Sequence, residues 1–162
     1  TIDTHVWLDP NNAVRIGFFI AALRSQQHPE HKAQYWANAK TFAQQLLVRS
    51  KQVGTYKNTV NSRSYHDAYQ YLEHSLNLHL AGALSTDPHI PATVTQIKYL
   101  NDHRPYPQMC LLAEGQANSQ YQILQPVRFQ AVDESMSAEN DFIQAWTDLA
   151  KNIQNCARNI RQ

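Results

Sequence analysis

The segment MCLLAE, residues 109–114, limits most strongly what this chain can fold into. It is a continuous apolar run of strand length, and it follows a turn that Pro105 and Pro107 bracket. A run of this kind is typical of a strand that is covered on both faces, as in a parallel sheet with helices above and below it. The segment therefore favours the α/β class.

Strand-like and helical segments alternate from residue 60 onward. The later strand candidates are 78–85, 109–114 and 127–133, and the helix candidates are 67–76, 93–101, 121–125 and 137–160. The last helix has the clearest amphipathic pattern, with apolar residues at steps of four and three from Phe142 to Ile160, and Ser137 is placed to cap it. The alternation predicts a parallel, doubly wound sheet of about four strands with helices on both faces.

Two longer helices are predicted before this region. Asp9 and Pro10 have the types expected at an N-cap and a first helical position, and the helix that they begin should run to about Gln27. Its apolar residues cover more than one face, so we expect it to be buried on two sides. A second helix should run from Pro29 to about Lys51.

Composition excludes several classes of function. The chain has 162 residues, 43% of them hydrophobic and 17% charged, as expected of a globular domain. Its net charge is +1 and the sequence has no block of basic residues, so we expect no nucleic-acid partner. With only four glycines it contains neither GxGxxG nor GxxxxGK[ST], which excludes nucleotide binding by those loops.

Three residues could form a metal site. Open parallel sheets bind ligands at the carboxyl ends of their strands, a rule that selects His66 and Asp133. His5 resembles His66 in lying just before a helix start that carries an acidic residue. Two imidazole nitrogens and one carboxylate oxygen suit zinc, and manganese accepts a mixture richer in carboxylates.

An enzyme is the competing interpretation. His66 could act as a general base with Asp67 or with Asp133. However, the sequence has no GxSxG elbow, and Cys110 lies in an apolar run that favours the neutral thiol. We therefore expect no catalytic activity.

The two cysteines, Cys110 and Cys156, leave the redox compartment open on spacing alone. They could be two buried thiols in a reducing cytosol or a disulfide in an oxidising compartment.

Four segments resemble motifs of the periplasmic or lipoprotein solute-binding proteins that deliver zinc or manganese to ABC importers, the ZnuA/TroA-like group. THVWLDPNNA is similar to the family motif HxWLDP, and YHDAYQYLEHSLNL is similar to the motif HDAYGYF. LLAEGQ is similar to the motif xxAEPQ. The fourth segment is VRFQAVD together with the closing helix. The resemblance implies that His5 and His66 are metal ligands, that Asp133 is the acidic ligand, and that Cys110 and Cys156 form a disulfide.

The same resemblance implies an arrangement of lobes. Members have two lobes joined by one long rigid helix, with the metal in the cleft between them. Residues 1–27 would be the approach segment and this inter-lobe helix, and residues 28–162 the later lobe, with the earlier lobe absent from the sequence. The implied partners are that lobe and the membrane permease of the importer, and the implied compartment is the periplasm. The implied ion is Zn²⁺, or alternatively Mn²⁺, bound weakly or not at all by the later lobe alone.

Two departures from the motifs support an alternative. NSRSY, residues 61–65, is polar where the family has an apolar strand, and VDESM, residues 132–136, replaces LDPLG. A diverged lobe without metal binding, acting as a structural or protein-interaction domain, would also fit.

Overall fold

The computed structural model describes residues 2–54, 68–85, 89–104, 107–114, 126–137 and 141–156, together with the backbone of residues 60–66 and 157–158. The expected helix at 121–125 and Asp67, the first residue of the helix expected at 67–76, lie outside these ranges.

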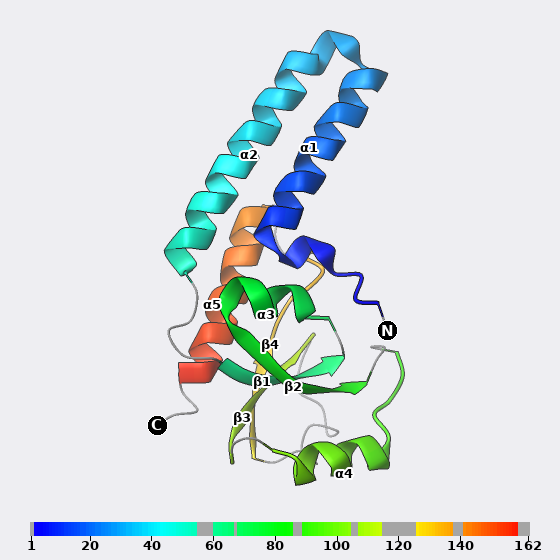
Figure 1. The fold of residues 1–162 in the computed structure, drawn as a ribbon, viewed down its shortest axis with the longest axis vertical. Helices are drawn as coiled ribbons and strands as arrows, with labels where there is room; N and C mark the ends of the chain where they lie inside the picture. Colours follow the sequence, from blue (N-terminus) through cyan, green and yellow to red (C-terminus); the bar gives the residue numbers. More distant parts are fainter. Residues whose placement is uncertain are drawn as a thin grey trace.

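A four-stranded parallel sheet forms the centre of the fold (Figure 1). Its strands are β1 (Val60–His66), β2 (Leu78–Ser85), β3 (Met109–Ala113) and β4 (Val127–Ala131), in the order β2-β1-β3-β4. All strand pairs are parallel, and every residue of β3 is buried. The expected α/β class, the strand number and the covered apolar strand are confirmed.

The polar segment NSRSY forms part of an inner strand. β1 pairs with β2 on one side and with β3 on the other, with Ser62 opposite both Leu80 and Cys110. Its backbone groups are therefore satisfied by two neighbouring strands. The register with β2 shifts between Ser62 and Ser64.

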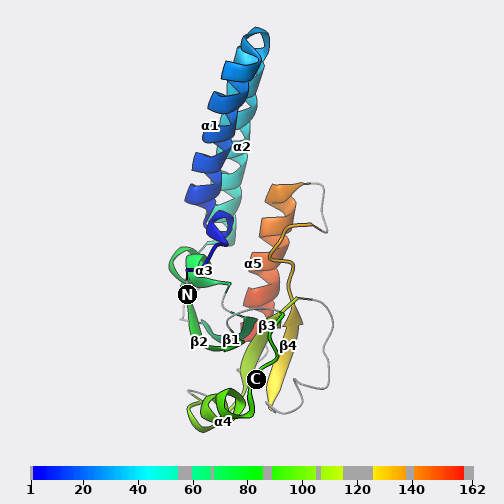
Figure 2. The ribbon, with the colours of Figure 1, turned by 90° about the vertical axis from the view of Figure 1, so that its right-hand side faces the viewer.

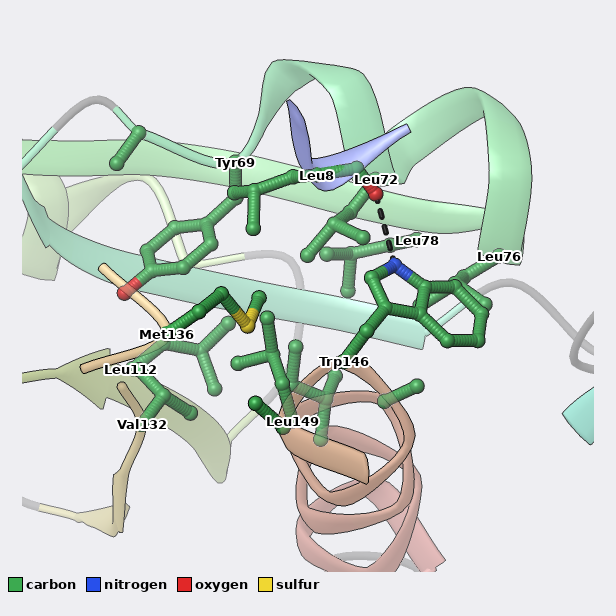
Figure 3. Close-up of a cluster of buried hydrophobic side chains, with 14 of the residues drawn as sticks. Leu8, Tyr69, Leu72, Leu76, Leu78, Leu112, Val132, Met136, Trp146 and Leu149 are labelled. Atoms are coloured by element: carbon green, nitrogen blue, oxygen red, sulfur yellow. Dashed lines mark hydrogen bonds between the residues drawn. The ribbon is translucent and has the colours of Figure 1, made fainter. Parts of the chain in front are cut away.

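Helices cover both faces of the sheet. On one face, α4 (Val94–Asp102) packs Ile97 and Leu100 against Leu84 and Leu111. On the other face, α3 (Gln70–Leu76) and α5 (Phe142–Arg158) pack into the main core. Figure 3 shows residues of this core from α3, β2, β3 and α5; its fully buried members include Leu8, Tyr69, Leu72, Leu112, Trp146 and Ile153.

The start of α5 differs from the prediction. The Asp141 carboxylate accepts hydrogen bonds from the backbone N–H groups of Ile143 and Gln144 at 2.8 and 3.4 Å, so Asp141 caps the helix. The Ser137 hydroxyl is instead hydrogen-bonded to Ser135 at 2.9 Å. Ser137 lies four positions before Asp141, and α5 begins at Phe142.

Two long helices form a hairpin that projects from the sheet (Figures 1 and 2). They are α1 (Pro10–Gln27) and α2 (Lys32–Val53), joined by a short 3-10 turn, Pro29–His31. Asp9 caps α1 as expected, accepting from the N–H groups of Asn11 and Asn12. The helices approach closely at Gly17, where a Cβ atom would lie 3.2 Å from the Phe42 ring.

The prediction that α1 is buried on two sides is wrong for the described residues. Only small residues and the first proline are buried: Pro10, Ala13, Ala21 and Ser25. A second apolar face is exposed, with Phe19 at 64% and Ile20 at 52% of their full accessibility. The reason is that α1 packs closely against α2 alone along most of its length (Figure 2).

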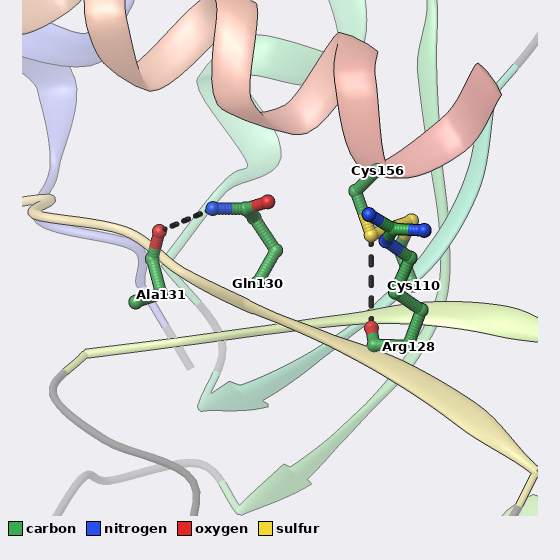
Figure 4. Close-up of a disulfide and its surroundings, with 5 residues drawn as sticks. All are labelled: Cys110, Arg128, Gln130, Ala131 and Cys156. Atoms are coloured by element: carbon green, nitrogen blue, oxygen red, sulfur yellow. Dashed lines mark hydrogen bonds between the residues drawn. A yellow bond between two sulfur atoms is a disulfide. The ribbon is translucent and has the colours of Figure 1, made fainter. Parts of the chain in front are cut away.

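A disulfide joins the sheet to the last helix (Figure 4). Cys110 in β3 and Cys156 in α5 are bonded, with their Cα atoms 6.0 Å apart, and both residues are buried. The Cys156 sulfur also lies 3.6 Å from the carbonyl oxygen of Arg128; this is a contact, because a disulfide sulfur has no proton to donate. The expected disulfide is confirmed.

No helix in the described ranges is long and apolar enough to cross a membrane.

Candidate metal centre

The first residues of the chain are fixed against three distant elements. The Trp7 indole donates a 2.9 Å hydrogen bond to the carbonyl of Glu134, which follows β4. The Trp146 indole of α5 donates a bond of the same length to the carbonyl of Leu8 (Figure 3). The Asp3 carboxylate accepts from the N–H of Gln70, the first residue of α3. These bonds place His5 beside the segments that follow β1 and β4.

His5 is oriented by Asp3. One Asp3 oxygen lies 2.8 Å from His5 Nδ1 and also accepts the His5 backbone N–H at 2.9 Å. An ionised carboxylate can only accept, so Nδ1 carries the ring proton. In the neutral ring, Nε2 then bears the lone pair. A histidine fixed in this way by a buried carboxylate is the usual form of a metal-binding imidazole.

Glu134 faces the other ring nitrogen. Its Oε1 lies 3.8 Å from His5 Nε2, and its Oε2 accepts a 2.5 Å hydrogen bond from the Tyr69 hydroxyl. Glu134 is only 5% exposed and Tyr69 is 1% exposed. The Trp7 ring contacts His5 edge-on, with ring centroids 5.3 Å apart. The histidine is thus flanked by a buried carboxylate and an aromatic ring.

Acidic groups gather around Tyr69. Burial raises the pKa of Tyr69 well above its ordinary value of 10.0; the charge of Glu134 and its hydrogen bond raise this pKa further, as do the charges of Glu114 and Asp133. Glu114 follows β3, and the other two acids follow β4. The phenol therefore remains protonated and donates to Glu134 at neutral pH.

The three residues proposed from the sequence have different placements. His5 lies in the centre just described. His66 is the last residue of β1, opposite Ser85 of β2, and its side chain lies outside the described part. Asp133 follows β4 as expected, but its carboxylate accepts a 2.7 Å hydrogen bond from Ser135, and no described contact joins it to His5.

In the described part of the chain, no group of three or more histidine, cysteine, aspartate or glutamate side chains is placed to hold a metal ion. What this part does contain is one oriented imidazole and one buried carboxylate oxygen opposite it.

Sequence reasoning did not select Asp3 or Glu134. The Asp-x-His spacing of Asp3 and His5 was a usable signal, because a carboxylate two residues away can reach the ring. No comparable signal separates Glu134 from Asp133. Neighbouring residues point to different sides, and Met136, with φ of 58°, adds a left-handed turn that sequence patterns do not specify.

In an open parallel α/β sheet, ligands bind outside the carboxyl ends of the strands, and the centre described above lies beside the ends of β1 and β4. Comparison with known families identifies the family of the chain. The model of the family "ZnuA: Zinc-uptake complex component A periplasmic" matches residues 1–156, and the chain belongs to this family.

Individual members of the zinc-uptake family are also similar to this chain in sequence. The chain is 32% identical over 103 residues to the high-affinity zinc uptake system protein ZnuA of Brucella abortus, covering 62% of this chain and 31% of that protein. It is 27% identical over 118 residues to ZnuA of Haemophilus ducreyi, covering 70% of this chain and 38% of that protein. The matches therefore span about a third of the length of these relatives.

Solved structures share the fold. The laminin-binding protein Lbp of Streptococcus pyogenes superposes with a TM-score of 0.76 at 18% identity, over 96% of this chain and 64% of that one. AdcAII of Streptococcus pneumoniae gives a TM-score of 0.76 at 22% identity, over 96% and 62%. A crystal structure of ZnuA gives 0.75 at 19%, over 97% and 63%.

Proposed function

We propose that this chain forms part of the zinc site of a periplasmic solute-binding protein that delivers the ion to an ABC importer and catalyses no reaction. The observation that carries the proposal is the orientation of His5, whose Nδ1 is held by Asp3 while Nε2 faces a buried carboxylate. Membership of the zinc-uptake family supports zinc as the ion.

The distance between His5 and Glu134 supports this assignment. A separation of 3.8 Å between Nε2 and Oε1 is too long for a good hydrogen bond. Two ligands of one tetrahedral zinc ion, each about 2.1 Å from the metal, are about 3.4 Å apart. An ion between the two atoms therefore needs only a small side-chain adjustment.

The remaining ligands come from the same edge of the sheet. We assign His66 as the second imidazole ligand, since it ends β1, three residues before Tyr69. Asp133 and Glu134 are the two candidates for the carboxylate ligand. Two imidazoles and one carboxylate favour Zn²⁺ over Mn²⁺, whose sites are richer in oxygen ligands.

The exposed face of α1 supports a second part of the proposal. Ile16, Phe19, Ile20 and Leu23 form an apolar face that nothing described covers. We assign this face to contact with an earlier lobe of the same protein, with the cleft closing over the zinc ion. The permease of the importer is the proposed recipient of the ion.

Isothermal titration of the chain with Zn²⁺ tests the site. His5→Ala should weaken zinc binding by more than about tenfold, because it removes a direct ligand. His31→Ala, at the exposed end of the hairpin, is the matched control and should bind as the unmodified chain does. Equal affinities for His5→Ala and the unmodified chain would show that the site is wrongly assigned. No zinc binding by any of the three would favour the structural or interaction domain instead.

A further inference from the structure

We propose that one face of the helical hairpin is a docking surface for an acidic protein segment that carries a bulky apolar side chain. We call this surface the basic face. It involves neither the metal centre nor the apolar residues of α1 assigned to the earlier lobe, so the proposal goes beyond the proposed function. The members of the basic face are Arg15, Phe18, Trp36, Lys40, Leu47 and Lys51.

Positive charge is concentrated in the part of the chain that forms the hairpin and the first strand. Residues 10–66 contain eight of the fourteen lysines and arginines but only one of the thirteen aspartates and glutamates. That one acid, Glu30, lies at the tip of the hairpin, 3.4 Å from a ring nitrogen of His28 and 3.8 Å from one of His31. The basic residues are spread along the segment without forming a run, so the fold decides where they gather.

Helical spacing and one ring contact place the members of the basic face on the same side of the hairpin (Figure 1). The four members on α2 recur at steps of four, seven and four residues, which return to one side of a helix. Arg15 and Phe18 are three residues apart and share one side of α1. The rings of Phe18 and Trp36 contact each other across the hairpin with centroids 6.0 Å apart, so the two helix sides form one surface.

The cations of the basic face have no acidic neighbour in the described part of the chain. Arg15, Lys40 and Lys51 are exposed, and no described carboxylate forms an ion pair with any of them. Like charges on one surface repel each other, and the field of such a surface attracts negative charge. A partner that brings carboxylates to this face would relieve the repulsion, which is the basis of charge complementarity between proteins.

A pocket at the base of the basic face offers a place for an apolar side chain. Its volume is about 530 Å³, within the range of ligand-binding pockets. Two members of the basic face, Leu47 and Lys51, line it, so an apolar wall and an unpaired positive charge lie together. The lining also includes Pro10 and Asn11 of α1 and His74 and Ser75 of α3.

The pocket favours a protein segment over a membrane surface. Three cations alone attach a protein only weakly to an anionic bilayer, because each contributes little and salt screens the attraction. A flat bilayer also leaves the pocket unfilled. A segment with several carboxylates beside one phenylalanine or leucine uses both the charges and the pocket.

Fluorescence anisotropy of a labelled synthetic peptide, with one central phenylalanine among glutamates, tests the proposal on the unmodified chain. The peptide should bind, and the same peptide with lysines in place of the glutamates should not. Lys40→Glu/Lys51→Glu should weaken binding by more than about tenfold. Lys98→Glu/Lys151→Glu changes the net charge equally at exposed positions outside the hairpin, and as the matched control it should weaken binding by less than about twofold.

A second pair of variants tests the pocket. Leu47→Ser should weaken binding of the phenylalanine peptide by about fivefold and leave binding of an all-glutamate peptide unchanged. Val48→Ser, at the next position of α2 and more exposed than Leu47, is the matched control and should change neither. Unchanged binding of the phenylalanine peptide by Leu47→Ser would overturn the assignment of the pocket.

The other possible occupants give distinct results. Absence of binding to the glutamate peptide, or equal losses in the two charge-reversed pairs, would overturn the proposal. Stronger binding to vesicles of phosphatidylglycerol and phosphatidylcholine than to the peptide, lost in Lys40→Glu/Lys51→Glu, would make the face a membrane contact instead. Self-association of the unmodified chain in sedimentation, lost in the same variant, would make a second copy of the chain the occupant.

Discussion

The indole nitrogen of Trp146 donates a 2.9 Å hydrogen bond to the carbonyl oxygen of Leu8, 138 positions earlier in the chain (Figure 3). Both residues are fully buried. This bond joins the segment that carries His5 to the helix that closes the core. The position of His5 therefore depends on the last helix of the fold as well as on its own neighbours.

Trp146→Phe should destabilise the protein. The substitution leaves the buried Leu8 carbonyl without the indole donor and removes buried ring volume, so we expect a loss of about 2–3 kcal/mol in the free energy of unfolding. Urea denaturation measures it. Trp36→Phe, on the projecting hairpin, is the matched control and should lose less than about 1 kcal/mol. Equal losses in the two variants would contradict the role of the Trp146–Leu8 bond.

Removing the disulfide should also destabilise the fold. Cys110 and Cys156 close a loop of 46 positions, for which the chain-entropy model gives about 4 kcal/mol. The double variant Cys110→Ala/Cys156→Ala should lose stability of this order in urea denaturation. Thiol titration of the unmodified chain under denaturing, non-reducing conditions is the independent check. Two reactive thiols there would contradict the bond.

Alkaline pH should destabilise the protein through Tyr69. Its pKa is raised in the folded state above the ordinary value of 10.0, which the unfolded chain retains. Above about pH 10 the unfolded chain has therefore lost the phenol proton that the folded chain still binds, and stability falls as the pH rises. Below about pH 9 this contribution is complete and constant.

Urea denaturation between about pH 9 and pH 11 measures this effect. The free energy of unfolding of Tyr69→Phe should fall less steeply with pH than that of the unmodified chain. Tyr99→Phe, which removes an exposed hydroxyl, is the matched control for the substitution itself. Parallel curves for Tyr69→Phe and the unmodified chain would contradict the buried Tyr69–Glu134 pair.

Two substitutions on α1 test which face of the helix is covered. Phe19→Ser changes an exposed side chain and should alter the free energy of unfolding of this chain by less than about 0.5 kcal/mol. Ala21→Leu, at a buried position of the same helix, should cost about 1–3 kcal/mol by overpacking. Thermal or urea unfolding of both variants measures the two changes in the free energy of unfolding. The reverse order of effects would place α1 with its other face inward.

Much of the fold could be predicted from local patterns. The apolar run 109–113 predicts an inner strand, and Asp9-Pro10 predicts the start of α1, because burial on both faces and helix capping each leave a local signature. The sequence pattern also indicates the second apolar face of α1. Whether this face is buried depends on which elements of the fold lie beside it, and periodicity does not specify those elements. Asp141 rather than Ser137 caps α5, because both are residue types that cap helices and the local pattern does not choose between them.

The candidate site was only partly predictable. His5 could be selected because its motif and its place before a helix start are visible in the sequence. Choosing between Asp133 and Glu134 requires the direction of each side chain after β4, which depends on the Trp7 and Tyr69 hydrogen bonds. Those bonds join residues 127 and 65 positions apart, and no local pattern records them.

Zinc-edge anomalous diffraction from crystals of the chain grown with Zn²⁺ tests the central claim most directly. The account predicts an anomalous peak at about 2.1 Å from His5 Nε2. A zinc peak bound elsewhere on the chain, with none beside His5, would contradict the account.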